Sequence, residues 1–178
     1  MTDEKKIQDL VALAQTGDKS AFGEIYEIYS SQIYNFLYAR LRHRETSEDL
    51  LHTIFLKAWT NLVRYKPQRT AKFSTWLFQI ANYTLIDHWR VRKQTVELDK
   101  VENLASLAEE PKAYEDYEFL WIGISELSLE HQAVLDLRFK QEMSVSETAQ
   151  VLGKSEVAVR VLQHRAIQAL KKKMQGKL

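Results

Sequence analysis

The residues best suited to chemistry lie in a short run near the carboxyl end of the chain. The run AVRVLQHRA (158–166) holds Arg160, His164 and Arg165 among apolar residues that recur at helical spacing. Arginine side chains can pair with base edges and with phosphates in a DNA major groove. The residue types therefore predict a helix that reads duplex DNA. The competing interpretation is a helical hairpin with a solvated polar face.

The segment 72–93 joins aromatic rings to a basic end. Its rings and cations are Phe73, Trp76, Phe78, Tyr83, Trp89, Arg90, Arg92 and Lys93. Bases of single-stranded DNA stack on such rings while Lys and Arg hold the phosphates. A helix is expected from Ser74 or Thr75 to about Arg92, in which Trp76 and Ile80 also recur at core spacing. For any one ring, packing in the core is therefore the competing interpretation.

Other chemistries find no support in the sequence. The chain has no Cys, which excludes disulfides, thiolate zinc sites, iron–sulfur clusters and cysteine nucleophiles. Its five His lack the spacing of an HExxH metal site, and there is no glycine-rich phosphate loop. Asp87 and His88 are interpreted as a carboxylate paired with Arg90 beside a surface histidine, not as a catalytic dyad. We expect no enzyme, no cofactor and no metal.

Composition favours helices as the elements that position these residues. Of 178 residues, 45% are hydrophobic and 28% are charged, and only 5 Gly and 2 Pro occur. Apolar spacing predicts four helices before residue 93, with Gly17 ending the first, Asp18 capping the second and Ser47 capping the third. Four more are expected near 119–126, 130–140, 144–152 and 156–173.

The second of these helices carries the longest apolar stripe. The stripe consists of Phe22, Ile25, Tyr26, Tyr29, Ile33, Tyr34, Leu37 and Leu41. Arg40, Arg42 and Arg44 crowd its end, where positive charge suits the helix dipole.

The segment 144–173 has the pattern of two helices joined by a tight turn. Ala149 lies in the first helix, Gly153 supplies the turn, and Ser155 can cap the second helix. A small residue and a turn glycine allow two helices to cross closely. The segment therefore predicts a helix-turn-helix with a recognition helix.

Charge is divided along the chain, although the total is only +1. Residues 1–93 and 119–178 carry net charges of +4 and +3, whereas 94–118 holds eight acids against two lysines. Two basic blocks around an acidic segment suit a nucleic-acid binder, and chance clustering of surface charge is the alternative. The sequence thus predicts an all-α protein of two small helical domains joined by an acidic linker.

Together these segments resemble bacterial RNA polymerase sigma factors of the sigma-70 family, specifically the extracytoplasmic-function (ECF) group. The resemblance begins at Gly17-Asp18 and is carried by SEDLLHTIFLKAW (47–59), FSTWLFQIANYTLIDHWR (73–90) and residues 127–171. It implies a transcription initiation factor that binds core RNA polymerase and directs it to promoters. By this resemblance, 1–93 is a region 2-like domain, 94–118 the acidic linker and 119–178 a region 4-like helix-turn-helix domain.

The resemblance also implies three sets of site residues. Docking on the polymerase is implied for Glu48, Asp49, Leu50, Leu51, His52 and Phe55. Capture of the melted minus-ten strand is implied for Lys72, Phe73, Trp76, Asn82, Tyr83, Asp87, Arg90 and Lys93. Reading of the minus-thirty-five element is implied for Lys154, Ser155, Val157, Ala158, Arg160, Val161, His164 and Arg165.

Three positions depart from the family pattern. His52 and Thr53 replace the Gln and Glu of DLxQExF, so the polymerase contact is expected to differ in detail. Tyr83 replaces a common Asn in the base pocket, where a ring could stack on a base that Asn would hydrogen-bond. Val157 replaces a common Gly early in the recognition helix, and its side chain limits how closely the backbone can approach DNA.

The partners implied are the β′ clamp and β subunits of core RNA polymerase, promoter DNA and an anti-sigma factor. The linker is expected to thread the RNA path of the polymerase, and a solvated acidic spacer is its alternative. A stand-alone helix-turn-helix regulator with a helical sensor domain is the alternative function, but it needs neither the 76–89 helix nor the linker. No apolar run approaches a membrane span and the amino terminus lacks a signal-peptide core, so a cytoplasmic protein is expected.

Overall fold

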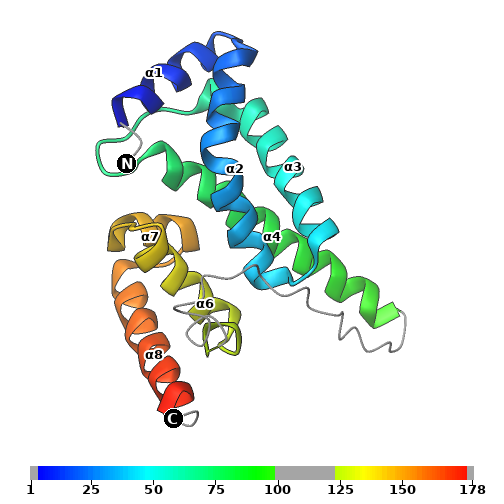
Figure 1. Ribbon diagram of the computed structural model, residues 1–178, viewed down its shortest axis with the longest axis vertical. Helices are drawn as coiled ribbons and strands as arrows, with labels where there is room; N and C mark the ends of the chain where they lie inside the picture. Colours follow the sequence, from blue (N-terminus) through cyan, green and yellow to red (C-terminus); the bar gives the residue numbers. More distant parts are fainter. Residues whose placement is uncertain (1–3, 99–122, 176–178) are drawn as a thin grey trace. The chain divides into compact units, whose positions relative to one another are not determined.

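Figure 1 traces the chain in a computed structural model that describes residues 4–98 and 123–175, with side chains described as far as Arg92 in the first range. The described residues fall into two compact units, one on each side of the gap. Every regular element among them is helical, which confirms the predicted all-α class with two helical domains. Most of the expected linker lies outside the described residues, and the domain boundaries at 93 and 119 stay predictions.

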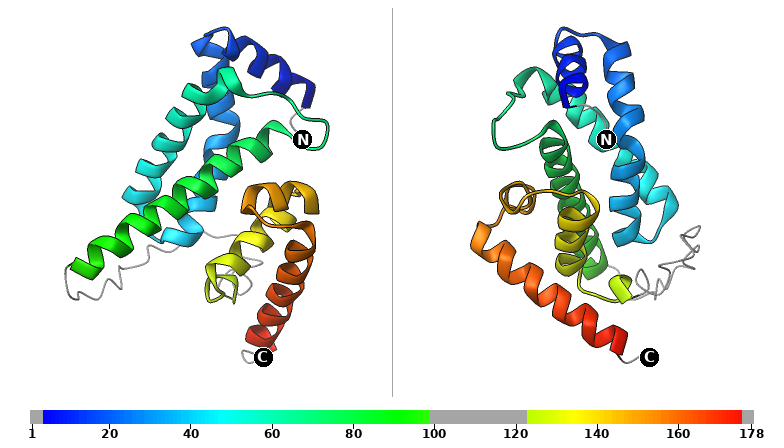
Figure 2. Two further views of the ribbon diagram at one scale, coloured as in Figure 1. Left: turned by 180° about the vertical axis from the view of Figure 1, so that it is seen from behind. Right: turned by 60° about the vertical axis from the view of Figure 1, so that its left-hand side comes forward.

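The first unit is a bundle in which three long helices share one core. It contains α1 (Glu4–Gln15), α2 (Lys19–Leu41), α3 (Arg44–Asn61), the 3-10 turn η1 (Leu62–Arg64) and α4 (Phe73–Leu98). Helices α2, α3 and α4 lie side by side, and α1 crosses near the start of α2 (Figures 1 and 2). Their apolar stripes meet in fully enclosed side chains, which include Ile25, Ile33, Phe36, Leu37, Ile54, Leu62, Leu77 and Phe78.

The turn between α1 and α2 forms as the sequence predicts. Gly17 has a φ of +95°, a left-handed conformation that suits glycine. The Oδ1 atom of Asp18 accepts hydrogen bonds from the backbone N–H groups of Ser20 at 2.8 Å and Ala21 at 3.1 Å. Asp18 is therefore the N-cap of α2, as predicted.

The predicted cap of the third helix is wrong, because α3 begins at Arg44 with His43 as its N-cap. The Nδ1 atom of His43 accepts a hydrogen bond from the backbone N–H of Thr46 at 3.2 Å. Ser47 lies inside the helix and is buried, and its hydroxyl donates to the His43 carbonyl at 2.7 Å. A serine hydroxyl can bond back to a carbonyl of the preceding turn, so it does not by itself mark a helix start.

The end of α2 differs from the expected stripe in two side chains. Phe36, which the predicted stripe omits, is fully buried, and Arg40 is only 6% exposed. The guanidinium carbon of Arg40 lies 3.7 Å from the centre of the Phe36 ring, and Nη1 donates to the Phe36 carbonyl. The negative face of an aromatic ring attracts a cation. Arg40 therefore belongs to the interior of the bundle.

Helix α4 is longer than predicted at both ends, since it begins at Phe73 and continues to Leu98. Residues 94–98, expected as the start of the linker, are therefore helical. Among the described side chains of α4, Leu85 is the last buried apolar one. The backbone hydrogen bonds of a helix can continue beyond its buried stripe, so apolar periodicity underestimates its length.

The second unit is a helix-turn-helix with its own core. Helical residues 123–125 precede α6 (Leu129–Leu135), the π-helical turn η3 (Asp136–Lys140), α7 (Val145–Leu152) and α8 (Glu156–Gln175). The predicted helix 130–140 is thus an α-helix followed by a wider turn. The core consists of Leu127, Val134, Leu135, Ala149, Val159 and Ala166.

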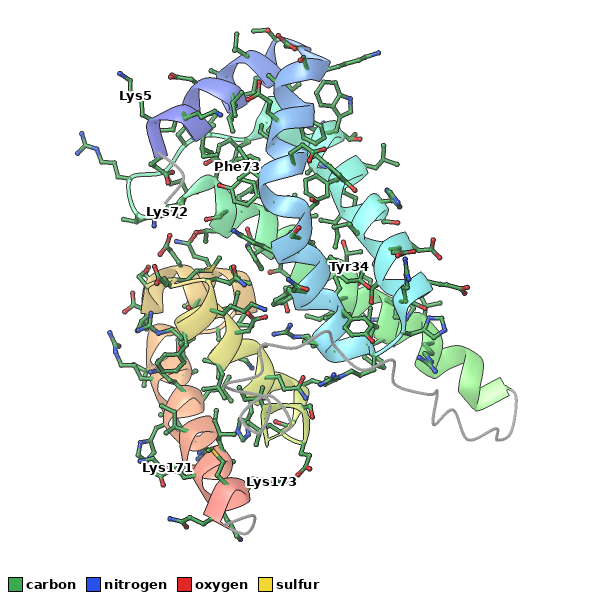
Figure 3. All side chains as sticks on the ribbon, viewed as in Figure 1. Lys5, Tyr34, Lys72, Phe73, Lys171 and Lys173 are labelled. Carbon is green, nitrogen blue, oxygen red and sulfur yellow. The ribbon has the colours of Figure 1, made fainter. Side chains whose placement is uncertain are left out.

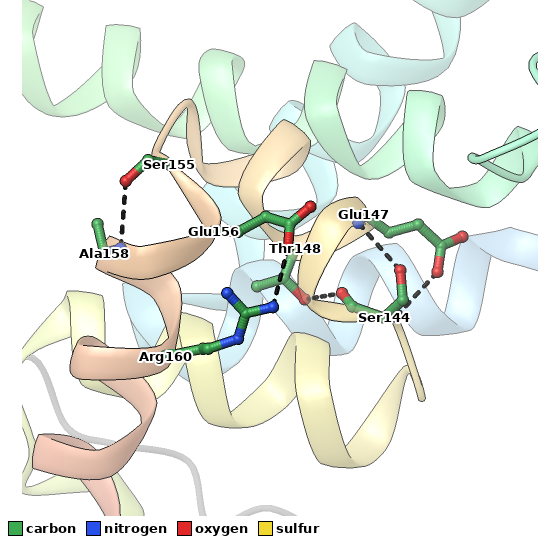
Figure 4. A network of polar contacts seen from close by, with 7 residues as sticks. All are labelled: Ser144, Glu147, Thr148, Ser155, Glu156, Ala158 and Arg160. Atoms are coloured by element: carbon green, nitrogen blue, oxygen red, sulfur yellow. Dashed lines mark hydrogen bonds and ion pairs between the residues drawn. The ribbon is translucent and has the colours of Figure 1, made fainter.

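Local hydrogen bonds hold the start of α7 and the turn that joins α7 to α8 (Figure 4). Ser144 and Glu147 cap α7 reciprocally, each side chain accepting from the other's backbone N–H at 3.1 and 2.9 Å. Gly153 ends α7 with a φ of +62°, and the hydroxyl of Ser155 accepts from the N–H of Ala158 at 3.2 Å. The glycine turn and the serine cap therefore form as predicted.

Gln15, at the end of α1, ties the chain that follows α3 to the bundle. Its Nε2 atom donates hydrogen bonds to the carbonyl oxygens of Leu62 at 2.9 Å and Tyr65 at 2.8 Å. These two carbonyls lie at the start and just beyond the end of η1. One side chain from α1 thus fixes the direction in which the chain leaves α3.

We predict that Gln15→Leu lowers the free energy of unfolding by about 1 kcal/mol, because it leaves two partly buried carbonyls without their donor. Urea unfolding of the whole chain, followed by circular dichroism, measures the change. Gln8→Leu is the matched control, since Gln8 is exposed on the same helix. Equal shifts for the two variants would contradict a role for these bonds.

Candidate functional site

One face of α3 presents polar groups and a large apolar side chain to solvent. Asp49, His52, Thr53 and Leu56 are all exposed, and their spacing places them in one row, which we call the docking face. Leu56 is 66% exposed. A single exposed leucine is common on protein surfaces, but this one continues a row of polar side chains. The docking face therefore combines charge with an apolar contact, as protein interfaces do.

The structure divides the six residues expected to dock on polymerase. Asp49 and His52 lie in the docking face, and Glu48 and Leu50 are half-buried. The remaining two side chains point into the bundle, where exposure falls to 7% for Leu51 and 4% for Phe55. These two hold α3 in place and present almost no surface to a partner.

Leu56 is the residue of this face that the sequence analysis missed. It falls outside the buried stripe of α3, which passes through Leu51, Phe55 and Ala58. Its helical position in line with Asp49 was the signal that could have found it.

A pocket of about 330 Å³ opens where α3, η1 and α4 meet. We call it the aromatic pocket, and it is lined by Lys57, Asn61, Arg64, Tyr65, Trp76, Ile80, Tyr83 and Thr84. The ring centres of Tyr65 and Trp76 lie 4.9 Å apart, with 47° between the ring planes. Lys57 Nζ donates to Thr84 Oγ1 at 3.1 Å, which joins α3 to α4 beside the pocket.

Phe73 supports this pocket from inside the bundle. It is 2% exposed, and its ring centre lies 5.9 Å from that of Tyr29, 5.3 Å from that of Tyr65 and 5.4 Å from that of Trp76. Figure 3 shows Phe73 at the start of α4, beside Lys72. Phe73 therefore positions the rings of the pocket rather than lining it.

The other residues expected at the minus-ten strand lie at different depths. Trp76 and Tyr83 line the aromatic pocket, and Tyr83 is 49% exposed. Lys72 is exposed, whereas Asn82 is 7% exposed. Further along α4, exposed Asp87 and Arg90 form the expected ion pair at 3.3 Å. The side chain of Lys93 lies outside the described residues.

The pocket also contains cations that the sequence analysis did not select. The charged residues among its lining are Lys57 and Arg64, and both are basic. Arg64 and Tyr65 stand together in the run VRYK (63–66), an aromatic ring between cations that could have signalled a nucleic-acid contact. Lys57 carries no such signal, because only the packing of α3 on α4 brings it to the pocket.

Burial shifts the pKa values of two tyrosines and one histidine in the first unit. Burial raises the pKa of Tyr65, and the Glu4 carboxylate adds to the rise. Burial likewise raises the pKa of Tyr29, with smaller contributions from Glu4 and Tyr65. On α4, burial and the nearby Arg92 cation lower the pKa of His88. Ionisation of the two phenols is therefore disfavoured further than in an exposed tyrosine.

Helix α8 presents most of the residues expected to read duplex DNA. Val157, Arg160, Val161, His164 and Arg165 are all exposed. They lie on the side of the helix away from the enclosed residues of the unit's core. The arrangement offers a helix surface of the kind that enters a major groove.

The remaining residues of that set lie around the turn before α8. Exposed Lys154 forms an ion pair with Glu130 at 3.1 Å, and Ser155 is exposed. Ala158 is half-buried, and its side chain is one methyl group. Its backbone N–H is engaged by the Ser155 cap.

Arg138 ties the π-helical turn to α8, a contact not foreseen from the sequence. Its Nε atom donates to Gln163 Oε1 at 3.0 Å, and its Nη1 atom donates to the Met143 carbonyl. π-Helical turns recur at functional positions in proteins. Here the turn η3 supplies a side chain that fixes one edge of the recognition helix.

Comparison with known families finds one match in each of the two units. The sequence matches "Sigma-70 region 2" over residues 25–95 and "Sigma-70, region 4" over residues 123–172. It is 33% identical over 176 residues to the ECF RNA polymerase sigma factor BldN of Streptomyces coelicolor, covering 95% of this chain and 66% of that protein. It is 34% identical over 163 residues to the RNA polymerase sigma factor YlaC of Bacillus subtilis, covering 88% of this chain and 93% of YlaC.

Two solved structures share the fold. CnrH, in complex with the cytosolic domain of CnrY, superposes with a TM-score of 0.71 at 24% identity, covering 99% of this chain and all of that one. The sigma factor RpoE of Bartonella quintana, in complex with the anti-sigma factor NepR, gives a TM-score of 0.75 at 18% identity over 86% of this chain and 96% of that one.

Within 4–98 and 123–175, no group of three or more His, Cys, Asp or Glu could hold a metal ion. No helix in these ranges is long and apolar enough to cross a membrane.

Proposed function

We propose a role for each functional surface on one premise: this chain belongs to the ECF group of the sigma-70 family and is a transcription initiation factor that directs RNA polymerase to promoters. The observation that carries the assignment is the aromatic pocket, where two packed aromatic rings lie beside two cations. Bases stack on such rings, and cations hold the backbone of a single strand. The pocket is accordingly the site that captures a base of the melted minus-ten element.

The other two surfaces complete the task. The docking face of α3 binds the β′ clamp of core RNA polymerase through Asp49, His52 and Leu56. Helix α8 reads the minus-thirty-five element, with Arg160 and Arg165 as its cationic contacts. These roles need no covalent chemistry from this chain, which supplies promoter choice to the polymerase and acts with it in the cytoplasm.

An anti-sigma factor is a further expected partner. Both solved structures described above contain a second protein, which is the cytosolic domain of CnrY in one and the anti-sigma factor NepR in the other. At 24% and 18% identity these structures support the fold alone. The expectation therefore rests on the family to which the chain belongs.

Run-off transcription tests the proposed function as a whole. Core RNA polymerase with this chain should transcribe a restricted part of a promoter library, and the selected templates should share an upstream and a downstream element. Core polymerase alone is the control. Uniform transcription of the library, or no increase over core alone, would refute promoter direction by this chain.

For the docking face, we predict that Asp49→Lys weakens binding to core polymerase about fivefold, since an exposed charge contact contributes on the order of 1 kcal/mol. Competition for core polymerase measures the change. The control is Asp9→Lys, which reverses an exposed acid on α1. The docking proposal fails if the two variants compete equally well.

For the aromatic pocket, we predict that Tyr83→Leu weakens holoenzyme binding to forked promoter DNA roughly 5- to 150-fold, because a stacked base contributes about 1–3 kcal/mol. Abasic sites placed one at a time in the minus-ten strand identify the base concerned. At that position, the losses of binding free energy caused by removing the base and by removing the ring should not be additive.

The matched control for this measurement is Tyr34→Leu, since Tyr34 lies on α2 and does not line the pocket. It should leave the effect of every abasic site unchanged. Additive losses for Tyr83→Leu at every abasic position would exclude base capture by its ring.

A further inference from the structure

Two valines occupy the centre of the exposed face of α8. Val157 is 67% exposed and Val161 is 45% exposed, and they lie one helical turn apart. At about 100° per residue, both are roughly opposite the fully buried Val159 and Ala166. A lone exposed valine is ordinary, but two in one row form an apolar ridge that the unit's own core does not use.

Cations flank this ridge on both sides. Arg160 lies on one side of it and Arg165 on the other, and both are exposed. Arg160 is also held in place by Glu156, with 3.0 Å between its Nη2 atom and Oε2 (Figure 4). A major groove has the complementary form, because base edges form its floor and two rows of phosphates form its rims.

The floor of the major groove offers one apolar group, the C5-methyl of thymine. Four residues of helix separate Val157 from Val161, which is about 6 Å along the axis. Successive base pairs are stacked about 3.4 Å apart, so the ridge reaches across one or two base steps. The valines therefore match methyl groups on adjacent or next-but-one base pairs.

We propose that Val157 and Val161 contact the C5-methyl groups of thymines in the minus-thirty-five element and thereby determine which bases are accepted there. This inference rests on the proposed function of α8 as the reader of that element. The arginines hold phosphates and base edges at the sides, and the valines discriminate against base pairs without a methyl group. Thymines on either strand satisfy the geometry.

Deoxyuridine substitution tests the contact, because it removes only the methyl group from thymine. Each thymine of the selected minus-thirty-five element is replaced in turn, and holoenzyme binding is measured at one fixed salt concentration. Loss of one methyl contact should weaken binding about fourfold at each of two nearby positions. In Val157→Ala one of these effects should disappear, and in Val161→Ala the other.

Val63→Ala is the matched control, since Val63 is 75% exposed and lies in the first unit. It should keep the full response to deoxyuridine. The inference is overturned if no deoxyuridine weakens binding, or if both valine variants respond as the parent does. It is also overturned if the selected element lacks two thymines, on either strand, at adjacent or next-but-one base pairs.

Arginine variants separate this inference from the proposed function beneath it. If Arg160→Ala and Arg165→Ala change neither promoter choice nor salt dependence, α8 is not the reader and both proposals fail. If these variants impair promoter choice while deoxyuridine has no effect, α8 is the reader and only the methyl contact is wrong.

Discussion

The contact between Phe73 and Tyr29 is the interaction on which the functional part of the first unit depends. Phe73 is the first residue of α4, and its buried ring lies against Tyr29 of α2 as well as against Tyr65 and Trp76. Close packing allows few alternative positions for such rings. The same contact therefore fixes the start of α4, the end of the preceding loop and the walls of the aromatic pocket.

In the second unit, small residues and local contacts position α8. Val159 and Ala166 are fully enclosed, so α8 lies close against the rest of the helix-turn-helix. Gly153 allows the reversal before α8, and Arg138 fixes one edge of the helix through Gln163. The position of α8 is therefore set by its buried face, by the turn before it and by Arg138.

Features set by neighbouring residues could be predicted from the sequence, and features set by distant ones could not. Gly17, Asp18 and Gly153 act through their own backbone or the next turn, so the types of the residues identified them. His43 and Ser47 can each make local bonds, and type alone did not decide between them. Lys57 joins the site only because α3 packs on α4. The family resemblance implied polymerase docking for Leu51 and Phe55, but both side chains are enclosed by the bundle. Their burial depends on how α3 packs, which the family pattern does not show.

Helix α4 is long and uninterrupted, and only its first part is packed in the bundle. From Phe73 to Leu98 it has 26 residues and is about 39 Å long. Its amino-terminal turn is clamped in the bundle, whereas its carboxyl-terminal end extends beyond Leu85, the last of its described side chains to be buried and apolar. Leu77, Phe78 and Ala81 are buried as well, so packing holds the first half of α4 in the bundle. The 13 residues after Leu85 extend about 20 Å. The direction that this packing gives to α4 therefore determines where residue 98, the last described residue of the first unit, lies.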